Sequence, residues 1–198
     1  DLSITEAAIG AGYWLSPEFR VGLSWRMVHV GGKFSTVRYT GSTLAEVDVD
    51  NISATRFNAW KLGLQYEEPA HRWGLGLALR TSISFTASGD TSGRYETNSA
   101  GSATTSLGTG TTEIRNTFPL QVSIGGWTRA TELLRVFWQY DFTNYSKDAA
   151  LELNGSVGAT PMTNVPQNWK NMNVLRLGAE YTRFFLPLRF GYSYTSQV

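Results

Sequence analysis

The sequence predicts an all-β fold, an antiparallel transmembrane β-barrel with meander topology, of which eight strands are visible. Three observations predict it. Several segments alternate strictly between apolar and small or polar residues, aromatic residues stand near the ends of these segments, and short connections alternate with long ones. Successive side chains of a strand point to opposite faces, so each such segment has one apolar and one polar face.

The first four expected strands have apolar residues at every second position. In residues 73–85, WGLGLALRTSISF, the odd-numbered residues are apolar apart from Thr81, and the even-numbered ones are Gly, Ala, Arg or Ser. The apolar faces of the three upstream strands are Ala7, Ile9, Ala11 and Tyr13 in 6–15; Phe19, Val21, Leu23, Trp25 and Met27 in 18–30; and Trp60, Leu62, Leu64 and Tyr66 in 57–67.

The last four expected strands repeat this period, and helical periodicity is absent. Their apolar faces include Phe118, Leu120, Val122 and Ile124 in 118–127, and Leu134, Val136, Trp138, Tyr140 and Phe142 in 134–145. Their polar faces include Arg176, Gly178 and Glu180 in 174–182, and Arg189 and Gly191 in 186–194.

The connections between these strands fall into two classes. Tight turns are expected near 16–18, 68–72, 129–133 and 183–185, and long loops at about 35–56, 88–115 and 148–168. In a meander this places every tight turn at one end and every long loop at the other. Short periplasmic turns and long extracellular loops are typical of outer-membrane barrels, so the long loops are predicted to be extracellular.

The apolar faces are predicted to meet lipid. A soluble sandwich also alternates, with its apolar faces buried in its own core. Here, however, the apolar faces carry no Asp, Glu, Lys or Arg, and the polar faces are rich in Gly, Ala and Ser. No run of eighteen apolar residues suggests a membrane-spanning helix. The predicted location is therefore the bacterial outer membrane, with its lipid as one partner.

The strand directions indicate a larger barrel. With the tight turns at the periplasmic end, both chain ends fall on the extracellular side, whereas single-chain bacterial barrels normally begin and end at the periplasmic face. We therefore expect residues 1–198 to be a single transmembrane segment from the middle of a larger barrel. An eight-stranded barrel complete in itself is the alternative.

Catalytic, metal and nucleic-acid functions have little support. The net charge is +1, there is no cysteine, and the two histidines fall on an apolar face (His29) and in a turn (His71). Residues 46–51, EVDVDN, could bind calcium, but alternate acidic residues are more common on a strand extension. We predict no enzyme, no cofactor, no metal and no nucleic-acid partner.

Residues 118–147, FPLQVSIGGWTRATELLRVFWQYDFTNYSK, resemble the FadL-type long-chain fatty acid transporter family. Residues 165–181, VPQNWKNMNVLRLGAEY, are similar to the segment that leads into this family's next strand. The resemblance implies a barrel of about fourteen strands, plugged by an N-terminal hatch, that carries hydrophobic compounds across the outer membrane. It also implies that Lys170 occupies a position where a basic residue meets the substrate head group.

The inward faces supply the candidate ligand-binding residues. A fatty acid needs apolar contact for its tail and a cation or polar donors for its carboxylate. The candidates for the head group are Lys170, Arg20, Arg26, Arg80, Arg135 and Arg176. The candidates for a tail pocket are Trp14, Trp127, Phe137 and Met172. Alternatively, these cations neutralise Glu6, Glu67, Asp141 and Glu180 within a polar lumen.

Three functions follow as hypotheses. The first is passive transport of long-chain fatty acids or other hydrophobic small molecules. The second is a non-transporting barrel that serves as scaffold or partner subunit of a surface or secretion assembly, with a protein partner at the long loops. The third is a small pore for polar solutes.

Overall fold

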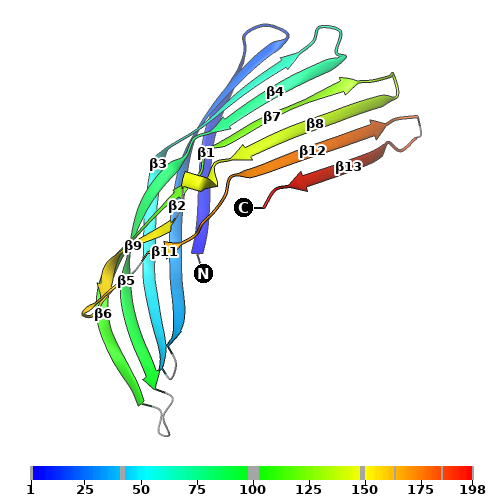
Figure 1. The fold of residues 1–198 in the computed structure, drawn as a ribbon. Helices are drawn as coiled ribbons and strands as arrows, with labels where there is room; N and C mark the ends of the chain where they lie inside the picture. Colours follow the sequence, from blue (N-terminus) through cyan, green and yellow to red (C-terminus); the bar gives the residue numbers. More distant parts are fainter. Residues whose placement is uncertain are drawn as a thin grey trace.

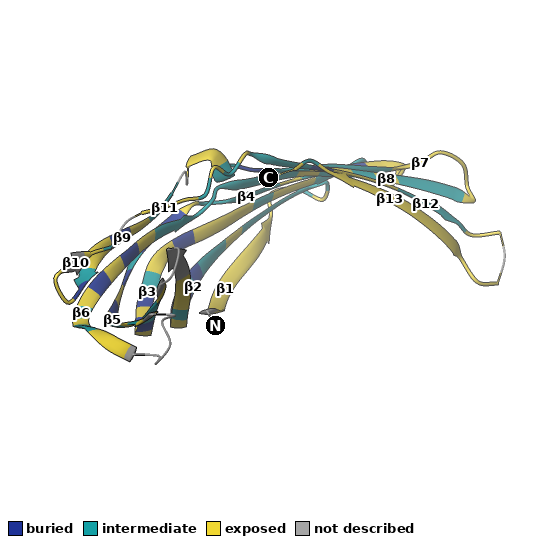
Figure 2. Cartoon of the chain, turned by 60° about the horizontal axis from the view of Figure 1, so that its bottom comes forward, coloured by how far each residue is buried: buried dark blue, intermediate teal, exposed yellow. Residues whose placement is uncertain are grey.

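The computed structural model describes residues 2–40, 43–97, 103–147, 150–162, 164–183 and 185–197. Their strands form one antiparallel sheet that bends into an arch (Figures 1 and 2). A single short 3-10 helix, Tyr145–Lys147, lies among these residues, and none of the described helical structure is long and apolar enough to cross a membrane. The strands are β1 (Leu2–Trp14), β2 (Phe19–Thr40), β3 (Thr43–Glu67), β4 (Trp73–Arg80), β5 (Ile83–Thr97), β6 (Ala103–Phe118), β7 (Gln121–Arg129), β8 (Leu134–Thr143), β9 (Ala150–Val157), β10 (Thr160–Pro161), β11 (Val165–Pro166), β12 (Met172–Tyr181) and β13 (Leu188–Thr195).

The antiparallel meander of eight strands is confirmed, although two of the eight are interrupted. Strand β3 pairs with β4 along one part of its length and with β5 along the other, so β4 and β5 are one strand broken at Thr81 and Ser82. Strands β6 and β7 are likewise broken at Pro119 and Leu120. Proline has no N–H for the ladder, which explains the second break.

Two of the three expected long loops are strands over their described residues. In 35–56, strands β2 and β3 pair out to Thr40 opposite Thr43, and in 88–115, β5 and β6 pair out to Thr97 opposite Ala103. Both segments contain β-branched residues, which favour strand. The third segment, 148–168, contains β9, β10 and β11, and β9 pairs with β6. The side of the membrane that these segments face stays a prediction.

One face of the sheet is apolar across all eight strands. The ladder pairings bring one residue of each strand into a single row. That row consists of Tyr13, Val21, Leu64, Leu77, Ile124, Tyr140, Leu175 and Tyr194. All of these except Val21 are exposed. A continuous exposed apolar surface is unfavourable in water and is what a lipid-facing barrel wall requires.

On the opposite face, the neighbouring row is made of glycine and polar residues apart from Trp14. Its members are Trp14, Arg20, Gln65, Gly76, Gly125, Gln139, Arg176 and Ser193. This row agrees with the predicted polar faces, and because the other face is the one suited to lipid, it is the inward side of the wall.

Beyond the two breaks, the inward face carries an apolar core. Ile83 and Phe85, expected on the lipid face, are only 2% and 8% exposed and pack with Val28, Ile114 and Leu153. The break at Thr81 and Ser82 changes which residues face inward: even-numbered residues in β4, odd-numbered ones in β5. The strict alternation read through 73–85 is therefore wrong after residue 80.

Candidate functional site

A groove of about 930 Å³ runs along the inward face where β2, β3, β4, β7, β8 and β12 lie side by side. Glycines form much of its floor: Gly12, Gly22, Gly63, Gly76, Gly125 and Gly178. Longer inward side chains line it above the floor: Arg20, Gln65, Trp127, Phe137, Gln139 and Arg176.

The floor is open because side chains are absent from it. A Cβ placed on Gly63 would meet no atom within 4 Å, and on Gly22 or Gly76 it would meet only a backbone oxygen, at 3.9 and 3.8 Å. None of these three glycines has a positive φ, so the backbone does not need glycine there. Their role is to leave space in the groove.

Aromatic rings and ion pairs occupy the walls. The Arg20 guanidinium lies 3.8 Å from the ring centroid of Trp14, and its Nη2 is 3.1 Å from Glu67 Oε2. The Arg135 guanidinium lies 5.1 Å from the Trp127 ring, within range of a cation–π interaction. Arg176 forms an ion pair with Asp141 on β8. The walls therefore combine apolar ring surface with neutralised charge.

Next to the groove lies a smaller recess of about 170 Å³. It is lined by Glu6, Arg26, Lys61, Ala78, Arg80, Gln121 and Ser123, two of which, Ala78 and Ser123, also line the groove. Arg26 Nε and Nη2 lie 2.5 and 2.6 Å from the two Glu6 oxygens, and Arg80 Nη2 lies 2.7 Å from Glu6 Oε2. We call this cluster the cationic recess.

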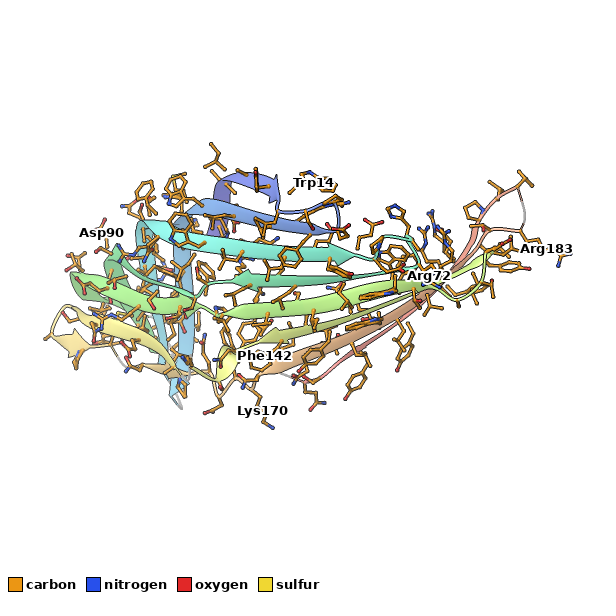
Figure 3. All side chains as sticks on the ribbon, turned by 90° about the horizontal axis from the view of Figure 1, so that it is seen from above. Trp14, Arg72, Asp90, Phe142, Lys170 and Arg183 are labelled. Atoms are coloured by element: carbon orange, nitrogen blue, oxygen red, sulfur yellow. The ribbon has the colours of Figure 1, made fainter. Side chains whose placement is uncertain are left out.

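The predicted site residues fall into three groups. Phe137 and Arg176 line the groove, and Arg26 and Arg80 line the cationic recess. Arg135 stands opposite Glu180 near the tight-turn end of β8. Met172 and Lys170 line neither space: Met172 is paired with Thr143, and Lys170 is exposed in the segment before β12 and points away from the sheet in Figure 3.

The alternative interpretation, that inward cations neutralise carboxylates, agrees with four of these side chains. Arg20 pairs with Glu67, Arg26 and Arg80 share Glu6, and Arg176 pairs with Asp141. The sequence analysis missed Lys61 and Gln121 as members of a site. Alternation placed both on polar faces, but only the register between strands brings them beside Glu6.

Neither histidine lines the groove or the recess. His29 Nδ1 lies 2.9 Å from Thr55 Oγ1, and His71 Nδ1 lies 2.8 Å from Glu67 Oε1. No group of three or more His, Cys, Asp or Glu side chains that could hold a metal occurs in the described part of the chain. Residues 46–51 lie within β3, as the strand-extension alternative predicted, and Glu46 binds Arg94 of β5 at 2.7 Å.

Comparison with known proteins gives consistent matches. A family model described as "Outer membrane protein transport protein (OMPP1/FadL/TodX)" matches residues 1–198. No curated protein matches the chain.

Similar solved structures include the toluene transporter TodX of Pseudomonas putida, with a TM-score of 0.75 and 15% identity, which covers 98% of this chain and 55% of that one. A FadL homologue of Pseudomonas aeruginosa gives a TM-score of 0.76 and 14% identity, covering 99% of this chain and 50% of that one. The toluene transporter TbuX of Ralstonia pickettii gives a TM-score of 0.67 and 18% identity, covering 98% of this chain and 56% of that one. At these identities the likeness shows the fold, and the chain spans about half the length of each structure.

Proposed function

This chain belongs to the outer membrane protein transport protein family (OMPP1/FadL/TodX), and from that premise we propose that it forms the lumen wall of a passive outer-membrane transporter for hydrophobic small molecules. The proposed cargo is a long-chain fatty acid or another hydrophobic compound. Two of the structural relatives, TodX and TbuX, are toluene transporters, which supports the broader class.

The glycine-floored groove is the observation that carries this proposal. It offers open volume beside the rings of Trp127 and Phe137 on the inward face. Each methylene group that leaves water contributes about 0.8 kcal/mol, so a groove of this kind can hold an alkyl chain or an aromatic ring without a strong polar anchor. The arginines around the groove that are paired with carboxylates keep the lumen polar, and they do not select one particular ligand.

The same groove supports transport over the two other hypotheses. A scaffold has no need for an open channel of glycines along its lumen, and a pore for polar solutes would not gain from the aromatic walls. Lateral movement of a hydrophobic ligand along the wall needs a smooth surface, which a row of glycines provides.

Uptake by intact cells tests the proposal. The full-length gene is expressed in a strain that lacks its own transporters of this family, and uptake of labelled oleate and toluene is measured. We expect the gene to raise the uptake of at least one of them several-fold over the empty vector. Unchanged uptake of both, with the protein folded in the outer membrane, contradicts the proposal. Rapid swelling of proteoliposomes in sugars would instead identify a polar pore.

A further inference from the structure

The turn between β12 and β13 carries apolar side chains that the described part of the chain leaves uncovered. Phe185 is 94% exposed and Leu186 is 60% exposed. The Thr182 N–H donates to the Leu133 carbonyl oxygen at 2.9 Å, which fixes the start of this turn beside the turn between β7 and β8. Figure 3 shows Arg183 at the tip of the hairpin, further out than Arg72 of the turn between β3 and β4.

The turns between β3 and β4 and between β7 and β8 are polar and internally bonded. Glu68 accepts hydrogen bonds from the backbone and side chain of Arg72, and Thr131 Oγ1 accepts one from the Leu134 N–H. Turns of this kind suit water, because short polar side chains satisfy the backbone within an exposed loop. The turn between β12 and β13 has the sequence TRFFLP over 182–187, so apolar residues stand where the other two turns are polar.

The exposed apolar residues of this turn continue the lipid face of β13. Even-numbered residues of β13 lie on that face and are exposed: Leu188, Phe190, Tyr192 and Tyr194. Leu186 follows at the same spacing, and only Pro187 stands between it and Leu188. The lipid-facing surface therefore reaches the turn without a charged residue on that face. A large exposed apolar surface is unfavourable in water, whereas the adjoining lipid contact can extend over it.

Arg183 places a positive charge beside these apolar residues. It is exposed, and its guanidinium makes no hydrogen bond or ion pair with the residues that the structure describes. An arginine at the edge of a membrane contact keeps its charge among the head groups while its methylene groups lie against hydrocarbon. The guanidinium is also a bidentate donor to phosphate. The turn therefore matches the boundary between acyl chains and phosphates.

We propose that the β12–β13 turn inserts into the membrane leaflet at the tight-turn end of the barrel, where Phe185 and Leu186 contact acyl chains and Arg183 binds a phospholipid phosphate. This leaflet is expected to be the periplasmic one. At this hairpin the hydrocarbon boundary then lies at the turn itself and not at the end of the strands. The contact fixes the depth of this part of the wall in the membrane, and it is independent of the proposed cargo.

Spin labels report the surroundings of the turn. Residues 1–198 contain no cysteine, so one can be introduced into the full-length protein once any cysteine outside this range is changed to serine. Phe185→Cys and, as a second variant, Leu186→Cys are labelled in nanodiscs of phosphatidylethanolamine and phosphatidylglycerol. Collisions of the label with oxygen, which concentrates in lipid, are compared with collisions with a water-soluble nickel chelate. We expect an oxygen-to-nickel ratio several-fold higher than at Ala130→Cys, the matched control in the polar β7–β8 turn, where the residue is also exposed.

Two results of this measurement overturn the proposal. A ratio as low as that of Ala130→Cys places the turn in water. Few collisions with either reagent mean that another part of the full-length protein, or a protein partner, covers the turn. The phosphate contact is tested by Arg183→Gln, which should lower the melting temperature by a few degrees in the nanodiscs and leave it unchanged in dodecyl maltoside, a detergent without phosphate. The same change in both media, or no change in either, overturns the phosphate contact.

Discussion

Gly22 and Gly63 stand directly opposite each other on β2 and β3, and a Cβ on Gly63 would find no atom within 4 Å. The groove therefore has its depth at this point because neither strand presents a side chain. We predict that Gly63→Phe fills the groove and weakens binding of a hydrophobic ligand at least about tenfold. Stability should be unchanged or slightly higher, because glycine is a poor strand residue. Ligand titration and thermal melting of the full-length protein measure the two effects.

The control for this substitution is Leu62→Phe, one residue earlier on the lipid-facing side, where the side chain is 45% exposed. It introduces the same ring on the same strand and should leave ligand binding intact. Normal binding by Gly63→Phe would show that the groove is not on the ligand's route.

Period-two alternation was enough to predict the eight strands and the lipid face of β1, β2, β3, β4, β7, β8, β12 and β13. It was not enough to predict the site. The cationic recess joins Glu6, Lys61 and Arg80 from three strands, and their proximity depends on register, which no local pattern encodes. The change of face after Arg80 was missed for the same reason. It results from the break at Thr81 and Ser82, which lies beside the break at Pro119 and Leu120 on the paired strand.

Leu77 tests the lipid face directly. It is 39% exposed on the apolar row, and its neighbour across the ladder, Leu64, faces the same way. Leu77→Arg should lower the free energy of unfolding in lipid by about 2–4 kcal/mol if it lies near the bilayer midplane. Gln65→Arg, on the inward face, should cost far less. Urea unfolding from vesicles measures both, and a reversed order would mean that the two faces have been exchanged.

Ile83 tests the change of face at the break between β4 and β5. It is buried with Phe85 and Ile114, so Ile83→Ala should destabilise the protein by about 2–5 kcal/mol, through lost transfer free energy and the cavity that remains. Leu79→Ala, before the break, should cost less than half as much, because lipid fills the space on that face. Equal losses at the two positions, compared by denaturant unfolding, would place Ile83 in lipid as simple alternation predicted.

Glu6 neutralises a buried guanidinium. Its side chain is 34% exposed, whereas that of Arg26 is 2% exposed, so Glu6→Gln leaves Arg26 without its counter-charge in a position that water reaches poorly. We expect a loss of about 1–3 kcal/mol in the free energy of unfolding. Glu180→Gln breaks the pair with the exposed Arg189 and should cost less than about 1 kcal/mol. Comparable small losses for both variants would show that Arg26 is solvated through the lumen.

Glu68 makes the turn between β3 and β4 sensitive to acid. Its carboxylate accepts hydrogen bonds from the Arg72 side chain and backbone N–H, both at 3.1 Å, and the Arg72 side chain is the main reason that the pKa of Glu68 lies below its ordinary value of 4.5. A carboxylate with a lowered pKa stabilises the folded turn above its unfolded pKa, and this contribution is lost as the pH falls through the folded pKa. Exchange of the Arg72 amide, corrected for the intrinsic rate, should therefore be slower at about pH 7 than at about pH 3. The Glu67–His71 pair lies in the same turn, so the decisive comparison is Glu68→Gln, which should exchange quickly at both pH values. A pH effect that persists in Glu68→Gln would assign it to the Glu67–His71 pair instead.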